Sequence, residues 1–314
     1  MLAFIVRRLI YTLIVIILVT LIAFCLLYVL PGDPATAMLG DDATPEQVER
    51  IRKQLWLDRP LIIQYGHWMD NLLHGDLGMS ITYSENATGP ILRALPITAY
   101  LAVIAMCISS ITGVSIGIIS AVKRATFLDN ILVIFANLGY ATPIFWLGLM
   151  GIYVFAYHLG WFPVQGFTWP ADDLGKSISQ TIMPVICLAV PSIAILARQT
   201  RSSMLEVIRQ DYIRTARAKG LRERAVILKH ALKNALIPVV TLLGILVRIL
   251  IGGSVLVETV FNIPGLGRLL ITSAIYGDFI VVQGGVLIIS FITCFANLLV
   301  DISYGWLDPR IRFE

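Results

Sequence analysis

Long apolar runs separated by polar segments dominate the pattern of this chain. Six of these runs are predicted to cross a membrane, at about residues 9–30, 96–121, 131–157, 181–197, 235–257 and 281–304. Most reach the ~20 residues that a helix needs to cross the hydrocarbon core of a bilayer. Because lipid offers the backbone no hydrogen-bonding partner, each run is expected to be helical. The pattern therefore predicts an all-α integral membrane protein with six transmembrane helices.

Prolines and glycines within the runs predict local irregularities. The fourth run is the shortest and contains Pro184 and Pro191, yet it carries no charge, and prolines are tolerated in transmembrane helices. In the third run, Gly139 and Pro143 are expected to weaken the backbone hydrogen bonding and to allow a bend.

The polar segment 31–95 is predicted to form a small helical insertion after the first transmembrane helix. Thr44-Pro45-Glu46-Gln47 has the residues of a helix start: an N-cap threonine, a proline at the first helical position and a glutamine that completes a capping box. One helix is therefore expected to reach about Leu57, and a second to run from about Pro60 to Leu73. The segment is acidic, and we expect it to pack on the bundle as a cap.

The composition agrees with a membrane protein. The chain is 57% hydrophobic and 14% charged, whereas about a quarter of a typical soluble chain is charged. Arg7 and Arg8 precede the first run, but the run is too long for a signal peptide and no small-x-small cleavage site follows it, so we predict a retained anchor. The four cysteines and four histidines are scattered, and no metal site or other cofactor site is predicted.

The distribution of positive charge predicts the orientation, because Lys and Arg near spans are retained in the cytoplasm. With six spans both termini share a side. Seven Lys or Arg lie on the opposite side. The side of the termini has sixteen, namely Arg7, Arg8, Lys123, Arg124, ten between Arg198 and Lys233, Arg310 and Arg312. Both termini are therefore predicted to be cytoplasmic and segment 31–95 extracytoplasmic.

The loop 198–234 is the largest cytoplasmic feature, with a net charge of +7. Leu205, Ile208 and Tyr212 recur at helical spacing, and smaller side chains follow before Gly220. Small residues allow a partner to approach the backbone closely, and the flanking basic residues can pair with its carboxylates. We therefore predict a docking helix, although an orientation signal alone also explains the charge.

The residues of this loop resemble a known family. Thr215-Ala216-Arg217-Ala218-Lys219-Gly220 and His230-Ala231-Leu232-Lys233-Asn234-Ala235-Leu236-Ile237-Pro238 are similar to the coupling motif of binding-protein-dependent ABC importer permeases, in the peptide, opine and nickel branch. The chain especially resembles the first of the two permeases in dipeptide, oligopeptide and glutathione importers. Further landmarks are Pro31-Gly32-Asp33-Pro34, Gly75-Asp76-Leu77-Gly78, Val257-Glu258-Thr259-Val260-Phe261, Pro264-Gly265-Leu266-Gly267-Arg268 and Asp308-Pro309-Arg310-Ile311-Arg312.

The resemblance implies that the loop contains a short coupling helix seated in a groove of a cytoplasmic ATPase. The general consensus begins with Glu-Ala-Ala, where this chain has Arg214, Thr215 and Ala216, and this departure matches the peptide branch. The implied coupling residues are Tyr212, Arg214, Thr215, Ala216, Arg217, Ala218, Lys219 and Gly220.

A charged face in the fifth run is the candidate translocation path. Arg248 lies near its middle, with Gly244 and Gly252 four residues away on either side and therefore on the same helical face. The face either lines the cavity, with Arg248 facing a substrate carboxylate or carbonyl, or packs against another helix or subunit. The resemblance places an outer gate at Glu258, Pro264, Gly265 and Gly267, while a solvated carboxylate at a helix end also explains Glu258.

The resemblance implies a type I ABC importer transmembrane fold and a non-enzymatic pore subunit in a bacterial cytoplasmic (inner) membrane. The implied partners are a second homologous permease, two ATPases that bind ATP and Mg, an extracytoplasmic binding protein and membrane lipid, but no nucleic acid. Gly175-Lys176-Ser177 matches the end of a phosphate-binding loop, but the glycine with which such a loop begins is absent, so this chain is not expected to bind ATP there.

The expected divisions of the chain are 1–30, with the first helix; 31–95, the insertion; 96–304, the permease core; and 305–314, the cytoplasmic C-terminus.

Small peptides are the first expectation for the substrate, and glutathione, nickel or a metallophore are alternatives. A secondary transporter or channel is a further alternative, but apart from Arg248 and Asp301 the runs hold almost no ionisable residue for ion coupling. An intramembrane enzyme would need a catalytic pair at membrane depth, and the sequence contains no such motif.

Overall fold

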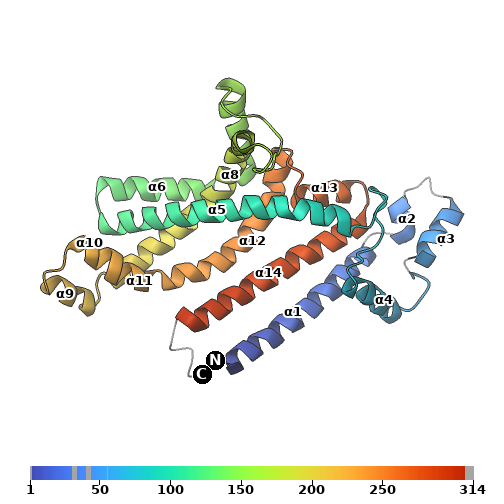
Figure 1. Cartoon of the computed structure of the whole chain (residues 1–314), viewed down its shortest axis with the longest axis horizontal. Coiled ribbons are helices and arrows are strands. Elements are labelled where there is room, and N and C mark those ends of the chain that lie inside the picture. Colours follow the sequence, from blue (N-terminus) through green and yellow to red (C-terminus); the bar gives the residue numbers. More distant parts are fainter. Residues whose placement is uncertain (1, 30–33, 40–43, 55, 308–314) are drawn as a thin grey trace. The chain divides into compact units, whose positions relative to one another are not determined.

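Helices joined by turns and loops make up the described part of the chain, which contains no strand beyond one isolated bridge between Met79 and Asn86 (Figure 1). Two compact units divide the chain. The landmarks at 31–33 and 308–312 lie outside the described residues. The computed structural model describes residues 2–29, 34–39, 44–54 and 56–307.

Unit 1 comprises Met1–Ile5, Ala99–Ile263 and Ala296–Glu314. Its elements are most of α5 (Thr88–Val122), α6 (Phe127–Ala141), α7 (Ile144–Gly151), the π-helix η1 (Ile152–His158), α8 (Leu174–Val207), α9 (Asp211–Ala218), α10 (Glu223–Ala225), the π-helix η2 (Val226–Ala231), α11 (Leu232–Ala235), α12 (Ile237–Val260) and the end of α14 (Phe279–Leu307).

Unit 2 comprises Val6–Thr98 and Pro264–Phe295. Leu77, Ile91, Leu266 and Val281 are among the buried residues that form its core. Its elements are most of α1 (Leu2–Val29), α2 (Pro34–Leu39), α3 (Pro45–Gln54), α4 (Leu61–Leu73), the start of α5, α13 (Leu266–Ile275) and the first part of α14.

The structure confirms the predicted membrane spans. Five helices are long and apolar enough to cross a bilayer: α1, α5, α8, α12 and α14. The third predicted span corresponds to α6 and the continuous α7–η1 segment, which meet at 100°, and the total is six when this bent pair is counted as one span. The break falls where Thr142 and Pro143 are extended, with ψ of 126° and 134°, and the proline has no N–H to continue the α6 hydrogen bonding. The bend expected near Pro143 is therefore present.

Helix α8 corrects the prediction for the fourth span. The apolar pattern indicated a short helix over about 181–197, but α8 runs for 34 residues and contains both prolines. In the apolar stretch of α8, 67% of the residues are buried. The corresponding share is between 17% and 39% in α1, α5, α12 and α14. Helices α6, α7, α11 and α12 pack against α8. Neighbouring helices therefore cover much of α8, which continues as a helix beyond the apolar run at both ends.

The insertion in unit 2 confirms the predicted helix start. The Gln47 N–H donates to Thr44 Oγ1 at 3.3 Å, and the Thr44 N–H donates to Gln47 Oε1 at 2.9 Å. Helix α3 ends at Gln54, three residues earlier than expected. Trp56 has a φ of 57°, a left-handed value that is incompatible with a right-handed α-helix. Its ring stacks on the His67 ring, with 4.1 Å between the centroids.

Helix α4 packs against α1 through polar and aromatic contacts. The hydroxyls of Tyr65 and Thr20 are 2.9 Å apart. The ring of Phe24 lies 5.4 Å from Tyr65 and 5.8 Å from Trp68, measured between centroids. The insertion thus has a direct contact with the first span.

Two glycines bring α5 and α8 into close contact in unit 1. A Cβ atom on Gly113 would lie 2.7 Å from the Leu196 Cβ, and one on Gly117 would lie 2.5 Å from the Thr200 Cβ and 2.7 Å from the Ala197 carbonyl oxygen. Real Cβ atoms do not approach other atoms so closely. This small-xxx-small pair therefore allows the two backbones to approach, as in other membrane helix pairs.

We predict that Gly117→Ala destabilises the folded chain by about 2 kcal/mol, the cost of overpacking a well-filled contact. Gly252→Ala is the matched control, because no heavy atom lies within 4 Å of a Cβ at that helical glycine. SDS-induced unfolding of the purified variants in mixed micelles measures the difference. Equal stabilities would contradict the close approach of α5 and α8.

Candidate functional site

The basic segment between α8 and α12 forms a short helix, α9. It begins after Gln210, which is extended with ψ of 149°, and ends where Gly220 adopts a φ of +74°. Glycine suits this left-handed position because it has no Cβ. Leu205 and Ile208 were expected on the same helix as Tyr212. Leu205 lies instead in the last turn of α8, and Ile208 caps that helix at the start of the turn 208–210.

The inner face of α9 packs within unit 1. Ile213 is fully buried and Ala216 is 7% exposed. Their buried neighbours are Ala121 at the end of α5, Met204 of α8 and Val226 of η2. The helix is therefore fixed to the ends of two long helices through apolar contacts, so a force applied to α9 reaches both.

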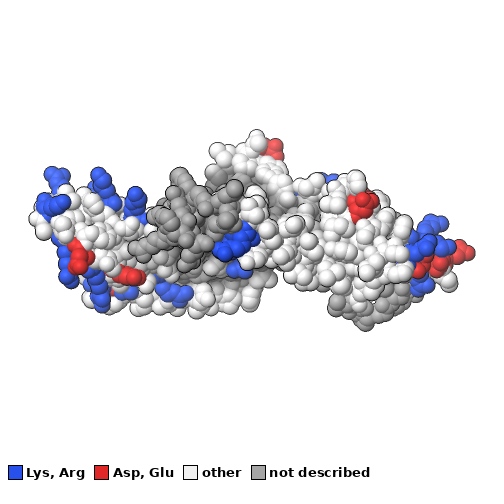
Figure 2. Space-filling model, turned by 90° about the horizontal axis from the view of Figure 1, so that it is seen from below, with Lys and Arg blue, Asp and Glu red and all other residues white. Residues whose placement is uncertain are grey.

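The outer face of α9 is open in the isolated chain. It carries small and polar side chains, and Figure 2 shows Lys and Arg gathered at this end of unit 1. Of the eight predicted coupling residues, only Ala216 lies on the inner side. The exposed ones are Tyr212, Arg214, Thr215, Arg217, Ala218, Lys219 and Gly220.

Some charges of this segment are already paired within the chain. Arg217 donates two hydrogen bonds to Glu223, at 3.1 and 2.6 Å, and its guanidinium lowers the pKa of the Glu223 carboxyl below the usual value. Arg214 lies 3.5 Å from Asp211. Lys219 has no ion pair among the described residues. The Arg217–Glu223 hydrogen bonds thus stabilise the turn after α9, whereas the Lys219 ammonium group is able to pair with a carboxylate of another protein.

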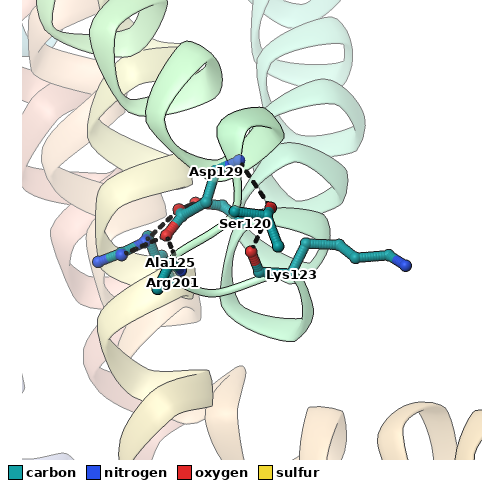
Figure 3. A network of polar contacts seen from close by, with 6 residues as sticks. Ser120, Lys123, Ala125, Asp129 and Arg201 are labelled. Atoms are coloured by element: carbon teal, nitrogen blue, oxygen red, sulfur yellow. Dashed lines mark hydrogen bonds and ion pairs between the residues drawn. The ribbon is translucent and has the colours of Figure 1, made fainter.

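A buried ion pair joins the α5–α6 turn to α8 (Figure 3). Asp129 is 2% exposed, and Arg201 donates to both of its oxygens, at 3.0 and 2.9 Å. The Ser120 hydroxyl donates to one oxygen, and the Ala125 N–H donates to the other at 3.0 Å. Sequence analysis missed this pair, because 72 residues separate its members and no local motif links them.

The predicted path residues on α12 have different surroundings. Gly244 is buried, and a Cβ there would lie 2.7 Å from Val300 of α14. Arg248 and Gly252 are exposed, and Arg248 makes no hydrogen bond or ion pair within the described residues. The packing interpretation therefore fits Gly244, whereas Arg248 and Gly252 form an open, charged part of the face.

The predicted outer-gate residues occupy the end of α12 and the start of α13. Glu258 is completely buried, so the alternative of a solvated carboxylate at the helix end is wrong. In unit 2, Pro264 is exposed, while Gly265 and Gly267 are buried. The Leu266 N–H donates to Thr98 Oγ1 at 2.8 Å, which anchors the start of α13.

The described residues contain no group of three or more His, Cys, Asp or Glu that is able to hold a metal ion. The four cysteines are free thiols.

Comparison with known proteins identifies the family. Residues 113–313 match the binding-protein-dependent transport system inner membrane component, and residues 1–102 match its N-terminal counterpart. The chain belongs to this family. It is a multi-pass membrane permease, as the sequence predicted.

Relatives cover the whole length of the permease. A putative peptide transport system permease protein from Brucella abortus (strain 2308) is 43% identical over 314 residues, which is 100% of both chains. A dipeptide transport system permease protein from Alkalihalophilus pseudofirmus is 40% identical over 333 residues, again 100% of both. A di/tripeptide transport system permease protein from Pseudomonas aeruginosa is 39% identical with the same coverage.

Solved structures share the fold of the permease. One, of an amino acid ABC transporter with histidines, has a TM-score of 0.53 at 17% identity and covers 69% of this chain and 94% of its own. An inward-facing MetNI methionine ABC transporter gives 0.53 at 18% identity, covering 68% and 95%. The expected type I ABC importer fold is confirmed.

We predict that Asp129→Asn lowers the stability of the permease by about 2 kcal/mol, because the buried side chain at position 129 loses its charge-assisted hydrogen bonds with Arg201. Asp211→Asn is the control: its pair with Arg214 is exposed, so its loss costs less than about 1 kcal/mol. Unfolding in mixed micelles measures both. If the two variants are equally stable, Asp129 does not hold α8.

Proposed function

We propose that this permease is a non-catalytic pore subunit of an ATP-driven importer of small peptides. It pairs with a second homologous permease and two cytoplasmic ATPases, and it receives substrate from an extracytoplasmic binding protein. The observation that carries the proposal is α9, a helix anchored on one side and open on the other. Full-length similarity to permeases named for peptide and dipeptide transport supports the substrate class.

The geometry of α9 supports a mechanical role. Apolar contacts of Ile213 and Ala216 hold the helix to the ends of α5 and α8. The exposed Thr215 and Ala218 are small enough to seat against a groove, and Lys219 supplies a charge for an acidic partner surface. Closure of an ATPase pair would therefore move α9 together with the helices to which it is attached.

Charge and orientation fit this arrangement. Lys and Arg near the spans predict that α9 lies in the cytoplasm, where ATPase subunits are found. Binding of ATP would close the ATPases, α9 would transmit the motion, and the cavity would open outward; hydrolysis would reset it. Arg248 and Gly252 would line the path, with the Arg248 guanidinium facing a peptide carboxylate or carbonyl.

Ala218→Glu is expected to abolish peptide uptake and co-purification of the ATPase, because it places a carboxylate on the docking face without touching the inner face of α9. Leu228→Glu is the control, since Leu228 is exposed on η2 in the same loop and outside α9. Uptake assays and pull-downs with normal amounts of the permease in the membrane measure the effect. Normal uptake by the Ala218→Glu variant would refute docking at α9.

Arg248→Met is expected to slow peptide uptake by about tenfold, the value of one charge-assisted hydrogen bond, while assembly stays intact. Ile245→Met is the control, because Ile245 is exposed on the same helix and is already apolar. Uptake and subunit stoichiometry are measured together. Loss of assembly would instead support a packing role for Arg248.

A further inference from the structure

Unit 1 contains a cavity of about 400 Å³ where α5, α6 and α8 meet. Most of its wall is apolar. The apolar lining residues are Ile116, Leu132, Val133, Ala136, Ala197 and Leu205.

The described polar side chains at this cavity include two guanidinium groups, those of Arg198 and Arg201, and no carboxylate. Arg198, Asn137 and Ser202 line it, and none of them has a hydrogen bond or ion pair among the described residues. The Arg198 guanidinium lies 5.2 Å from the ring centroid of Tyr140, which orients it by a cation–π contact. Arg201 also lines the cavity and keeps Nη1 free of described partners, because only Nε and Nη2 bind Asp129.

The described residues that line this cavity include no carboxylate. Asp129, which binds the lining residue Arg201, is already engaged, because its oxygens accept hydrogen bonds from Arg201, Ser120 and the Ala125 N–H. An arginine at the edge of a span pairs with a carboxylate or faces an anion or water, and the described lining offers Arg198 no carboxylate. The cavity therefore has the chemistry of a site for an anion.

The cavity lies near the end of α5 and beside the first charged residue that follows the apolar part of α8. Arg198 directly follows the uncharged run 181–197, and Ser120 lies two residues before the end of α5. Lys123 and Arg124 continue beyond that end. Under the orientation of the proposed function, this is the cytoplasmic boundary, where basic pockets between transmembrane helices bind anionic headgroups.

We propose that this cavity binds the phosphate of an anionic phospholipid of the inner leaflet. Arg198, Asn137 and Ser202 donate to the phosphate oxygens, and the apolar wall contacts the start of an acyl chain. A peptide is the weaker fit, because its ammonium group would lie beside Arg198 and Arg201 with no free carboxylate among the described lining residues. The positive headgroup of a zwitterionic lipid meets the same charge repulsion.

The test measures lipid binding by the full-length permease, purified with its co-purifying subunits in phosphatidylcholine nanodiscs. Fluorescent phosphatidylglycerol is titrated in, and bound lipid is identified by native mass spectrometry. Arg198→Gln is expected to weaken phosphatidylglycerol binding by about tenfold or more, because a charge-assisted hydrogen bond is lost. Arg198→Lys, which keeps the charge without the planar fork, is expected to lie in between.

Arg209→Gln is the matched control, since Arg209 is exposed beyond α8 and does not line the cavity. The proposal is overturned if Arg198→Gln and Arg209→Gln bind phosphatidylglycerol equally, or if fluorescent phosphatidylcholine binds as tightly. Displacement of the lipid by a saturating dipeptide would also overturn it and assign the cavity to peptide. No transport is measured, so failure here leaves the proposed importer function untouched.

Discussion

The burial of α8 is the constraint on which unit 1 depends. Four neighbouring helices pack against it, the α5 glycines approach its backbone, and Asp129 fixes its Arg201 to the α5–α6 turn. In lipid, helices gain little from hydrophobic burial against one another, so close packing and buried polar contacts must provide the specificity. Contacts of several kinds therefore hold α8 in place within unit 1.

The short helices α9, η2 and α11 follow the end of α8. One small apolar cluster joins α9 to α5 and α8, and the outer face of α9 is exposed. The cavity at Arg198 lies between α5, α6 and α8, beside the Asp129–Arg201 pair. A lipid phosphate bound there would add a charge contact between α6 and α8, and the lipid composition of the membrane would then influence the stability of this part of unit 1.

Features that depend on neighbouring residues or on apolar runs were predicted from the sequence, whereas features that depend on contacts between distant segments were not. Thr44 and Gln47 are three residues apart, and Pro143 acts on its own backbone, so the capping box and the bend were predicted. The length of α8 was underestimated because hydropathy does not register burial by other helices. Glu258 was ambiguous at a helix end, and its burial depends on tertiary packing. Gly244 and Gly252 share a face, but only Gly244 meets α14.

The most direct test of the central claim is site-specific cross-linking from α9 in assembled membranes. A photo-reactive residue at position 219 is compared with one at position 228, outside α9. The account predicts that position 219 forms an adduct with a nucleotide-binding subunit, and that only a reagent able to cross the membrane labels a cysteine there from the extracytoplasmic side. An adduct with the binding protein, or none with a nucleotide-binding subunit, would contradict it.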